Sequence, residues 1–322
     1  MSALFAHDFS DLYLEPDGGA WYKTWSNDPI RRSFSSGAME ELESLRAAIP
    51  AADGCSDFRL EWQGKRMRGS SRRTSNGLLY VIRRQGAAPI PFEEIGYSSV
   101  LIKALESPAL QAGGLVVVQG ATGHGKTNSL YSLLVARLKK YGGVAYTIEN
   151  PIEMRAEGRH AGASAEGTCY QTEVSSDADM EGEMISCLRA CPNIIMPGEV
   201  KTPRIAAQAM TAAAAGHLVL ITFHGRNTQA GLQRLSAMAA EAGMDPFLFA
   251  ESIAAIVHQT MSATVVDGAV KRTLETSPLI VTGSKQEDAI RANLRKGDFS
   301  GLASEIPRQA RVASMKDPAA VF

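Results

Sequence analysis

Residues 114–134, GLVVVQGATGHGKTNSLYSLL, pass from an apolar, β-branched run through a glycine-rich loop into a helical pattern. The loop matches the motif GxxxxGK followed by Ser or Thr, with a strand before it and a helix after it. Glycines let successive backbone N–H groups turn inward, and the helix N-terminus adds partial positive charge. The stretch therefore predicts a strand–loop–helix unit that holds phosphate groups. A glycine-rich turn that only starts a helix is the weaker alternative.

The residues of this loop have expected places around ATP and Mg²⁺. Lys126 should reach the β- and γ-phosphates, and Thr127 should bind Mg²⁺ through its hydroxyl. His124 occupies a variable position of the loop, so we assign it no chemistry of its own. The predicted nucleotide-binding set in this stretch is Gly120, Ala121, Thr122, Gly123, His124, Gly125, Lys126, Thr127 and Asn128.

Strands and helices alternate after the loop. The sequence has helical patterns at 126–143 and 203–216, and strand patterns at 144–149, 193–199 and 217–224. This order predicts βαβ units, an α/β fold with a parallel sheet, and ligands at the carboxyl ends of its strands. Residues 245–261 then have the period of a helix. Residues 263–275 predict a hairpin that turns at Asp267 and Gly268, and residues 285–297 predict a last helix before a polar tail.

The N-terminal part of the chain has a different pattern. Residues 39–50 are helical in period, whereas 57–73 and 77–85 alternate apolar and polar residues between glycine-containing turns. This pattern predicts a small α+β domain built on an antiparallel sheet. Pro89 and Pro91 disfavour a helix or central strand after it. We therefore expect an N-terminal domain at 1–85, an interdomain linker at 86–112 and a nucleotide-binding domain at 113–322.

Composition limits the function classes. The 322 residues are 45% apolar, and 33 Lys and Arg balance 34 Asp and Glu, so no global charge favours nucleic acid or a membrane surface. Residues 206–223 are better explained as an alanine-rich helix followed by a buried strand than as a membrane helix. The first ten residues lack the pattern of a signal peptide, so we expect a cytoplasmic protein. Four cysteines without a CxxC pair predict reduced thiols rather than a zinc module: Cys55, Cys169, Cys187 and Cys191.

Two glutamates come at the ends of predicted strands of the same sheet. Glu149 ends TIE, and Glu199 ends NIIMPGE. Both would project toward the edge that carries the phosphate loop, where one could organise Mg²⁺ or orient an attacking water. Either glutamate alone could equally be a solvated residue at a strand end, but the pair on one sheet favours catalysis.

His217 and His224 bracket the strand at 217–224. They lie about 23 Å apart if that strand is extended, so they cannot share a metal. One of them could sense the γ-phosphate, and either could be an ordinary core or surface histidine. The N-terminal domain has a series of basic residues, and the simplest interpretation is that they lie on solvated strand faces. The sharper hypothesis is that one or two are arginine fingers that reach a neighbouring subunit's nucleotide. A nucleic-acid-binding patch is a third interpretation, but the aromatic residues that would stack on bases are missing from the series. That series is Lys65, Arg66, Arg68, Arg72, Arg73, Arg83 and Arg84.

Together these motifs resemble the secretion and pilus traffic ATPases, a family that includes pilus retraction ATPases and type IV secretion or conjugal transfer ATPases. GATGHGKT resembles the family's phosphate loop, and TIENPIE its Asp box, which places Glu149 and Glu153 on the acidic positions. PNIIMPGEV resembles its atypical Walker B, which ends in Gly–Glu, and GHLVLITFH its His box. The segments 57–73 and 78–84 resemble arginine-bearing strands, and DAIRANLRKGD resembles a retraction-ATPase segment.

The resemblance implies a RecA-like P-loop NTPase domain with a smaller, PAS-like N-terminal domain, assembled as a hexamer that hydrolyses MgATP at subunit interfaces. It assigns catalysis to Glu199, Glu149, Lys126 and His224, and Mg²⁺ to Thr127, with both glutamates acting through water. Nucleotide contacts would come from His217 and, in a neighbouring subunit's site, from Arg83, Arg68 and Arg72.

The same resemblance implies a cytoplasmic motor recruited to inner-membrane components of a pilus or secretion machine, with no direct nucleic-acid binding. The chain also departs from the family pattern at Asn150, Lys201, Thr202 and Gly225. Asn150 and Lys201 motivate one alternative, a nucleotide-binding ring subunit with weak or partner-dependent hydrolysis. A nucleic-acid translocase on the same core is a second, separate alternative.

Overall fold

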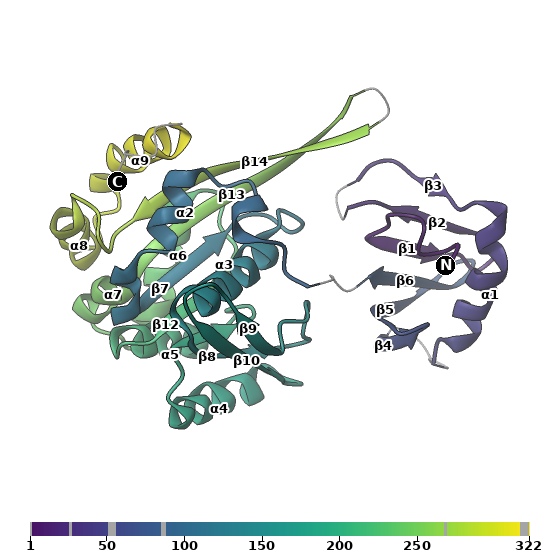
Figure 1. Ribbon diagram of the computed structural model, residues 1–322, viewed down its shortest axis with the longest axis horizontal. Helices are drawn as coiled ribbons and strands as arrows, with labels where there is room; N and C mark the ends of the chain where they lie inside the picture. Colours follow the sequence, from purple (N-terminus) through teal and green to yellow (C-terminus); the bar gives the residue numbers. More distant parts are fainter. Residues whose placement is uncertain (1, 26–27, 51–55, 85–87, 267–268, 316–321) are drawn as a thin grey trace. The chain divides into compact units, whose positions relative to one another are not determined.

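The computed structural model describes residues 2–25, 28–50, 56–84, 88–266, 269–315 and 322. It divides into two compact units, residues 1–87 and 88–322. The mixed α/β architecture predicted from the sequence is confirmed, with a small N-terminal unit that is mainly β and a larger α/β unit (Figure 1).

The first unit is an antiparallel sheet of order β3-β2-β1-β6-β5-β4. Its elements are β1 (Asp11–Leu14), β2 (Ala20–Lys23), β3 (Arg32–Ser33), α1 (Met39–Ala48), β4 (Ser56–Trp62), β5 (Lys65–Thr74) and β6 (Gly77–Arg84). Leu42 and Leu45 of α1 pack with Met67 of β5 and Ile82 of β6 on one face of the sheet. The alternation in the sequence, with Met67 buried and Arg68 exposed, thus separates a core face from a polar face.

The second unit contains a sheet of order β14-β13-β7-β12-β11-β8-β10-β9, in which the six inner strands are parallel and the two edge strands are antiparallel to their neighbours. The strands are β7 (Gly114–Gln119), β8 (Gly143–Glu149), β9 (Gly158–Ala161), β10 (Glu166–Glu173), β11 (Ile194–Pro197), β12 (Leu218–Phe223), β13 (Ile253–Val266) and β14 (Ala269–Ile280). Edge strand β14 carries Pro278 opposite Val257 of β13.

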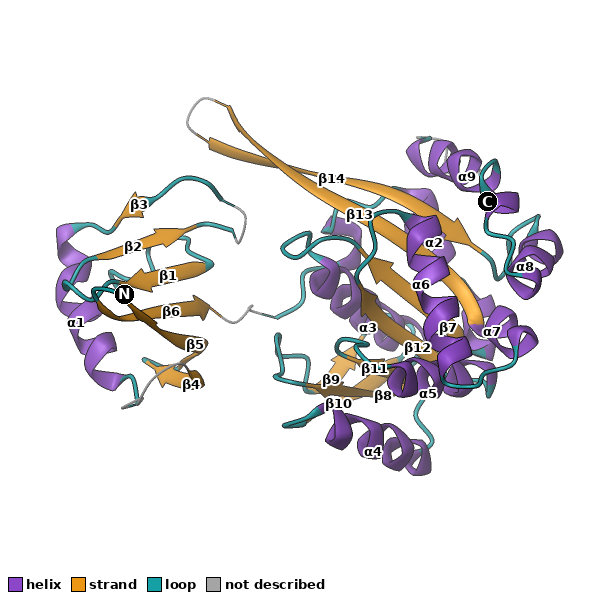
Figure 2. Ribbon diagram, turned by 180° about the vertical axis from the view of Figure 1, so that it is seen from behind, coloured by secondary structure: helices purple, strands orange, loops and turns teal. Residues whose placement is uncertain are grey.

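Helices cover both faces of this sheet (Figure 1 and Figure 2). The core on one face includes α2 (Ser99–Leu105), α3 (Lys126–Tyr141) and α9 (Glu305–Ser314). The core on the other face includes α4 (Asp177–Cys187), α5 (Pro203–Ala214), α6 (Thr228–Glu241), α7 (Pro246–Ser252) and α8 (Glu287–Lys296). Along β7, Leu115 and Val117 pack in one core, and Val116 and Val118 pack in the other. This two-sided burial explains why the inner strands are apolar throughout.

The expected linker at 86–112 differs from the structure, because residues 88–112 belong to the second unit. They contain α2, and Phe92, Tyr97, Leu101 and Leu105 are buried in the same core as β7 and α3. Apolar residues at helical spacing after Pro91 bury this segment, so it packs as part of the nucleotide-binding unit.

The helix predicted over 245–261 is wrong in its second half. Helix α7 ends at Ser252, and β13 begins at Ile253 between β7 and β14. Residues 253–257 are all buried. A strand with neighbours on both sides and helices on both faces buries every residue, whereas a helix with one apolar face leaves its other face exposed. The turn predicted at Asp267 and Gly268 lies outside the described residues, but the paired strands on either side of it are present.

The polar tail predicted after 297 also differs, because it contains α9. Val312 and Ala313 of this helix are buried. The buried amide of Gln309 accepts a hydrogen bond from the Ile280 N–H at 2.6 Å and donates to the Ile280 carbonyl at 3.0 Å. The helix therefore satisfies the backbone at the end of edge strand β14.

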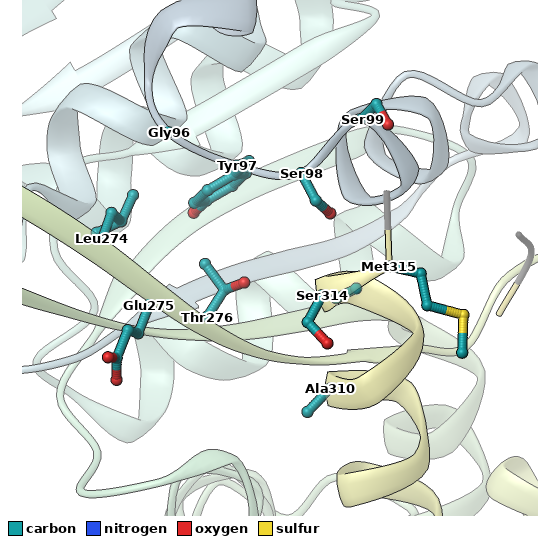
Figure 3. Close-up of a pocket in the computed structure, with 11 residues that line it drawn as sticks. Gly96, Tyr97, Ser98, Ser99, Leu274, Glu275, Thr276, Ala310, Ser314 and Met315 are labelled. Carbon is teal, nitrogen blue, oxygen red and sulfur yellow. The ribbon is translucent and has the colours of Figure 1, made fainter. Parts of the chain in front are cut away.

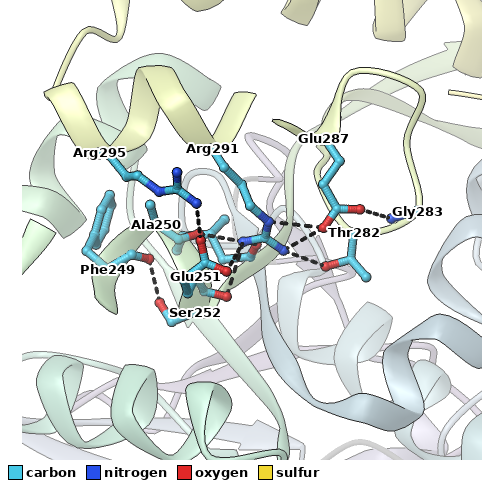
Figure 4. A network of polar contacts seen from close by, with 10 residues as sticks. Phe249, Ala250, Glu251, Ser252, Thr282, Gly283, Glu287, Arg291 and Arg295 are labelled. Carbon is cyan, nitrogen blue, oxygen red and sulfur yellow. Dashed lines mark hydrogen bonds and ion pairs between the residues drawn. The ribbon is translucent and has the colours of Figure 1, made fainter. Parts of the chain in front are cut away.

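Helix α8, the segment that resembles part of the retraction ATPases, is tied to α7 through Arg291 (Figure 4). The guanidinium donates to the carbonyls of Ala250 and Glu251 at 2.6 and 3.2 Å, and to Glu287 at 2.9 Å. Because the last carbonyls of a helix have no partners within the helix, Arg291 caps α7 and holds α8 against it.

None of the helices in the described residues combines the length and the apolar composition needed to cross a bilayer. Residues 206–223 form the end of α5 and all of β12, as the sequence predicts. Cys169, Cys187 and Cys191 carry free thiols, whereas Cys55 lies outside the described residues.

Candidate functional site

The predicted phosphate loop connects β7 to α3. Gly120, Gly123 and Gly125 have φ angles of 153°, 81° and 78°, a region that only glycine occupies without strain. A Cβ on Gly120 would lie 2.3 Å from the Gln259 carbonyl oxygen of β13. The missing side chains therefore let the loop close against the neighbouring strand and begin α3 at Lys126.

Lys126 points back into this loop. Its side chain is buried, and its Nζ donates to the carbonyls of Gly120 and Ala121 at 3.0 and 2.9 Å. Burial lowers the pKa of Lys126, and the negative charges of Glu199 and Glu153 oppose that lowering. The ammonium is thus held by two loop carbonyls, and the carboxylates of Glu199 and Glu153 lie near enough to act on its charge.

Glu149 ends β8 and is only 2% exposed. Its Oε1 accepts hydrogen bonds from Tyr131, from the Thr147 hydroxyl at 2.7 Å and from the Gln171 amide at 3.3 Å. Its Oε2 accepts from the Glu153 N–H at 3.2 Å. Burial raises the pKa of Glu149, and these donors oppose that rise. The carboxyl group is therefore fixed by neutral partners on several elements.

Glu199 lies beyond β11, and its side chain is 40% exposed. The neighbouring strand positions it, because Glu199 bridges to Thr222 of β12 and Thr222 donates to the Gly198 carbonyl at 2.7 Å. His224 Nε2 lies 2.8 Å from Glu199 Oε1, and Lys201 Nζ lies 3.7 Å from Oε2. The structure thus brings His224 and Glu199 together.

His217 lies at the other end of β12. Its Nδ1 is 2.7 Å from the Pro192 carbonyl oxygen, and its own carbonyl accepts from the Gly114 N–H, where β7 begins. Because β12 and β7 are parallel, His217 lies where both strands begin, and the phosphate loop lies where both strands end. The structure does not bring His217 to the phosphate loop of its own chain.

The predicted arginines lie on the first unit. Arg68 of β5 is directly opposite Arg83 of β6, and Arg72, four residues along β5, shares their face. Arg83 is 54% exposed and pairs with the buried Asp11 at 2.7 Å. The strand register thus gathers three arginines on the face opposite the Met67 core.

The loop fits a nucleotide triphosphate and Mg²⁺. The positive φ angles of the three glycines let successive backbone N–H groups turn toward phosphate oxygens, and Lys126 supplies the buried positive charge. Thr127 follows Lys126 in the first turn of α3, and the Glu199 carboxylate adds oxygen donors of the kind that Mg²⁺ prefers. Thr127 and Glu199 are the residues that would hold the ion, and Asn128 is exposed beside them.

Sequence reasoning missed several residues of this site. Tyr131 and Gln171 bond to the Glu149 carboxylate, and Gln259 contacts the phosphate loop. The signal for Gln259 is a polar side chain two residues after the apolar run at 253–257. Tyr131 leaves a similar signal, because it lies among apolar residues on the buried side of α3.

Comparisons with known proteins agree with this geometry. The family described as "Type II/IV secretion system protein" matches residues 38–296. The type II secretion system protein HxcR of Pseudomonas aeruginosa is 30% identical over 276 residues, which are 78% of this chain and 54% of HxcR. The type IV pilus assembly ATPase TfpB of Acinetobacter baylyi is 33% identical over 172 residues, 53% of this chain and 27% of TfpB. The chain thus spans between about a quarter and a half of these relatives.

Two solved structures share the fold. The pilus retraction motor PilT with bound ADP superposes with a TM-score of 0.72 at 20% identity, over 94% of this chain and 87% of PilT. The ATPase DotB of Legionella pneumophila superposes with a TM-score of 0.70 at 18% identity, over 98% of this chain and 90% of DotB. At these identities the likeness establishes the arrangement of the two units' elements and not their chemistry.

Proposed function

Because this chain belongs to the family of type II/IV secretion system proteins, we propose that it is an ATPase that hydrolyses MgATP and couples hydrolysis to mechanical work. One observation carries the proposal: a buried lysine in a glycine loop faces a half-exposed glutamate that is paired with a histidine at the same sheet edge. Phosphoryl transfer to water needs a phosphate cradle and a group that orients the water.

The residues divide the work by their environment. Lys126 places a positive charge at the phosphates, and Thr127 holds the metal, which neutralises charge on the phosphate oxygens when it is bound. Glu199 orients the attacking water and receives its proton, because its carboxylate is accessible to solvent. His224 holds that carboxylate from one side at 2.8 Å. Glu149 keeps the end of β8 in place rather than touching the reacting atoms.

The working form would be a ring of six copies. The cluster of Arg68, Arg72 and Arg83 supports this, because it lies on the exposed face of the first unit's sheet and an arginine that acts on a neighbouring copy's nucleotide must lie at the protein surface. Relative movement of the two units would then turn hydrolysis into work. The ring would be recruited from the cytoplasm to inner-membrane components of a pilus or secretion machine, with pilus retraction, secretion and conjugal transfer as the candidate tasks.

Weak, partner-dependent hydrolysis is the second candidate. The observation in its favour is the Lys201 ammonium 3.7 Å from Glu199, because an ion pair at the carboxylate competes with an attacking water for the same oxygen. Asn150, which follows Glu149 where retraction ATPases have aspartate, points the same way. In this form, a partner would have to move Lys201 away from Glu199 before hydrolysis became fast.

The test measures steady-state ATP hydrolysis with Mg²⁺ across protein concentration, with particle mass determined by light scattering on the same samples. Lys126→Ala is expected to lower turnover by about 10²–10³-fold, because it removes charge stabilisation at the phosphates. Lys139→Ala, an exposed lysine near the end of the same helix, is the matched control. Equal turnover in wild type and Lys126→Ala would refute the motor. Tight MgATP binding by a ring without turnover would support the second candidate.

A further inference from the structure

Gln259 occupies a special place beside the phosphate loop. Strand β13 pairs with β7 as far as His258, which lies opposite Gln119. Gln119 is the last residue of β7, and the phosphate loop begins at the next residue, Gly120. Gln259 is therefore the first residue of β13 that meets the loop instead of a strand, and it is fully buried. A buried amide is stable only if its polar atoms find partners, so its contacts are informative.

The amide of Gln259 bonds to both sides of the loop. Its Nε2 donates to the His124 carbonyl at 2.6 Å, and its Oε1 accepts from the Ser129 hydroxyl at 3.0 Å, in the first turn of α3. The main chain makes contact as well, since the Gln259 carbonyl oxygen lies 3.3 Å from His124 Nδ1 and is the group that a Cβ on Gly120 would strike. One residue thus holds the loop and the start of its helix together.

The same Oε1 accepts a second hydrogen bond, from the hydroxyl of Tyr97, which lies far from the loop in sequence. Tyr97 is 6% exposed and precedes α2, in the segment that leads from the first unit into the nucleotide-binding core. Burial raises the pKa of its hydroxyl, so the group stays protonated and donates. Gln259 therefore connects this segment directly to the phosphate loop.

The Tyr97 segment, residues 92–105, borders a pocket on one side. A pocket of about 550 Å³ lies between residues 96–99 and the β14 residues 274–276, beside the last turn of α9 (Figure 3). The segment is thus fixed inward by the Tyr97 hydroxyl, while its pocket side borders solvent-filled space. Because Phe92 and Leu101 anchor the segment in the core, a change in the Tyr97 contact can shift only residues 96–99, which border the pocket.

We propose that Gln259 is a positioning residue that couples the phosphate loop to the Tyr97 segment, so that phosphates bound in the loop and the position of that segment depend on one another. The inference rests on the proposed nucleotide site but not on hydrolysis. When phosphates reorder the loop around His124 and Ser129, the shared amide changes how firmly Tyr97 is held. Coupling of this kind is reciprocal, so loosening Tyr97 must also weaken phosphate binding.

The test uses Tyr97→Phe, which removes only the hydroxyl, and Gln259→Leu, which removes both halves of the link. MgADP affinity is measured by calorimetry, and hydrogen exchange of residues 92–105 is followed by mass spectrometry. We expect MgADP to protect this segment in the wild type and the protection to disappear in both variants. Loss of one neutral hydrogen bond should weaken MgADP binding by about five-fold in Tyr97→Phe. The double variant should bind little worse than Gln259→Leu alone.

Tyr141→Phe is the matched control, because the Tyr141 hydroxyl likewise donates one hydrogen bond, to the backbone carbonyl of Glu106 at 2.6 Å and away from Gln259. The control should retain wild-type affinity and protection. Independent, multiplying effects of the two substitutions, or wild-type protection of residues 92–105 in Tyr97→Phe, would overturn the coupling. Should Gln259→Leu fail to fold, Tyr97→Phe still decides. A wild-type protein that binds MgADP but never hydrolyses ATP would refute the ATPase and leave this test intact.

Discussion

Two neighbouring strands of the sheet, β8 and β11, both lead to a glutamate at the same edge, and the two glutamates have opposite environments. Glu149 is 2% exposed and receives hydrogen bonds from Tyr131, Thr147 and other neutral donors. Glu199 is 40% exposed, and its partners are a histidine and a lysine. One carboxyl group is part of the framework, and the other is available to solvent.

This difference shows how one sheet edge can supply both rigidity and reactivity. Neutral donors in a buried network fix a geometry, because breaking any one of them leaves an unpaired polar group. Partners at the surface exchange with water at little free-energy cost. A catalytic base must exchange partners during the reaction, so the exposed carboxylate is suited to proton transfer and the buried one is not.

The largest expected effect is on turnover at the exposed carboxylate. Glu199→Gln should lower ATP turnover by about 10²–10⁴-fold, because the amide cannot accept the proton of the attacking water. Its urea unfolding midpoint should match that of the wild type. Glu241→Gln, an exposed glutamate at the end of α6, serves as the control. If turnover survived in Glu199→Gln, the two glutamates would have to exchange roles.

Stability is expected to respond at the buried carboxylate instead. Glu149→Leu should lower the free energy of unfolding by about 2–4 kcal/mol, because it leaves the buried donors of Tyr131 and Thr147 without their acceptor. Urea titration followed by circular dichroism measures the change. The exposed Glu153, changed to Leu in the same way, should alter stability by less than about 0.5 kcal/mol. Equal effects at both positions would remove the distinction drawn here.

The pH dependence of the free energy of unfolding should differ between the wild type and the Glu149→Gln variant. Burial raises the folded-state pKa of Glu149 above its ordinary value, so the folded protein binds this proton more tightly than the unfolded chain does. Its contribution to stability is therefore fullest below the ordinary pKa and falls as pH rises through the raised one. Relative to wild type, Glu149→Gln should therefore gain stability as pH rises across this interval. Unfolding titrations at several pH values check the sign, and the opposite trend would mean that the donors outweigh burial.

The smallest expected effect concerns Lys201. Its side chain is 48% exposed and lies 3.7 Å from Glu199, so the pair contributes little in water. Lys201→Met should change turnover by less than about two-fold, measured in the same ATPase assay. A many-fold increase would instead show that Lys201 restrains the carboxylate, which is the behaviour expected of a subunit with partner-dependent hydrolysis.

The parts of the fold that the sequence predicts are those specified locally. The phosphate loop needs only a strand, a glycine pattern and a helix start within about twenty residues, and all three appear in 114–134. The helix predicted over 245–261 fails because the choice between helix and strand depends on β7, which lies more than a hundred positions earlier in the chain. An apolar run buried on both faces gives no period that separates the two structures.

The site follows the same division. Lys126, Thr127 and Glu199 belong to motifs and are found from the sequence, whereas the residues that hold them are not. Gln259 contacts His124 across 135 positions, and Gln171 contacts Glu149 across 22. Such supporting residues depend on strand order, which places β13 beside β7 and β10 beside β8. A single sequence gives the identity of these residues but does not show which residues they contact in the fold.

Helix α9 has a consequence for the edge of the large sheet. An edge strand presents backbone groups that another strand can pair with. Where α9 packs on β14 these groups are already covered, because Gln309 bonds to both backbone groups of Ile280, and the nearby Pro278 is buried and has no N–H to donate. Farther along β14, Lys271 and Arg272 are exposed and carry charges that an incoming strand would have to bury. Growth of the sheet from one molecule into the next is thereby discouraged along this strand.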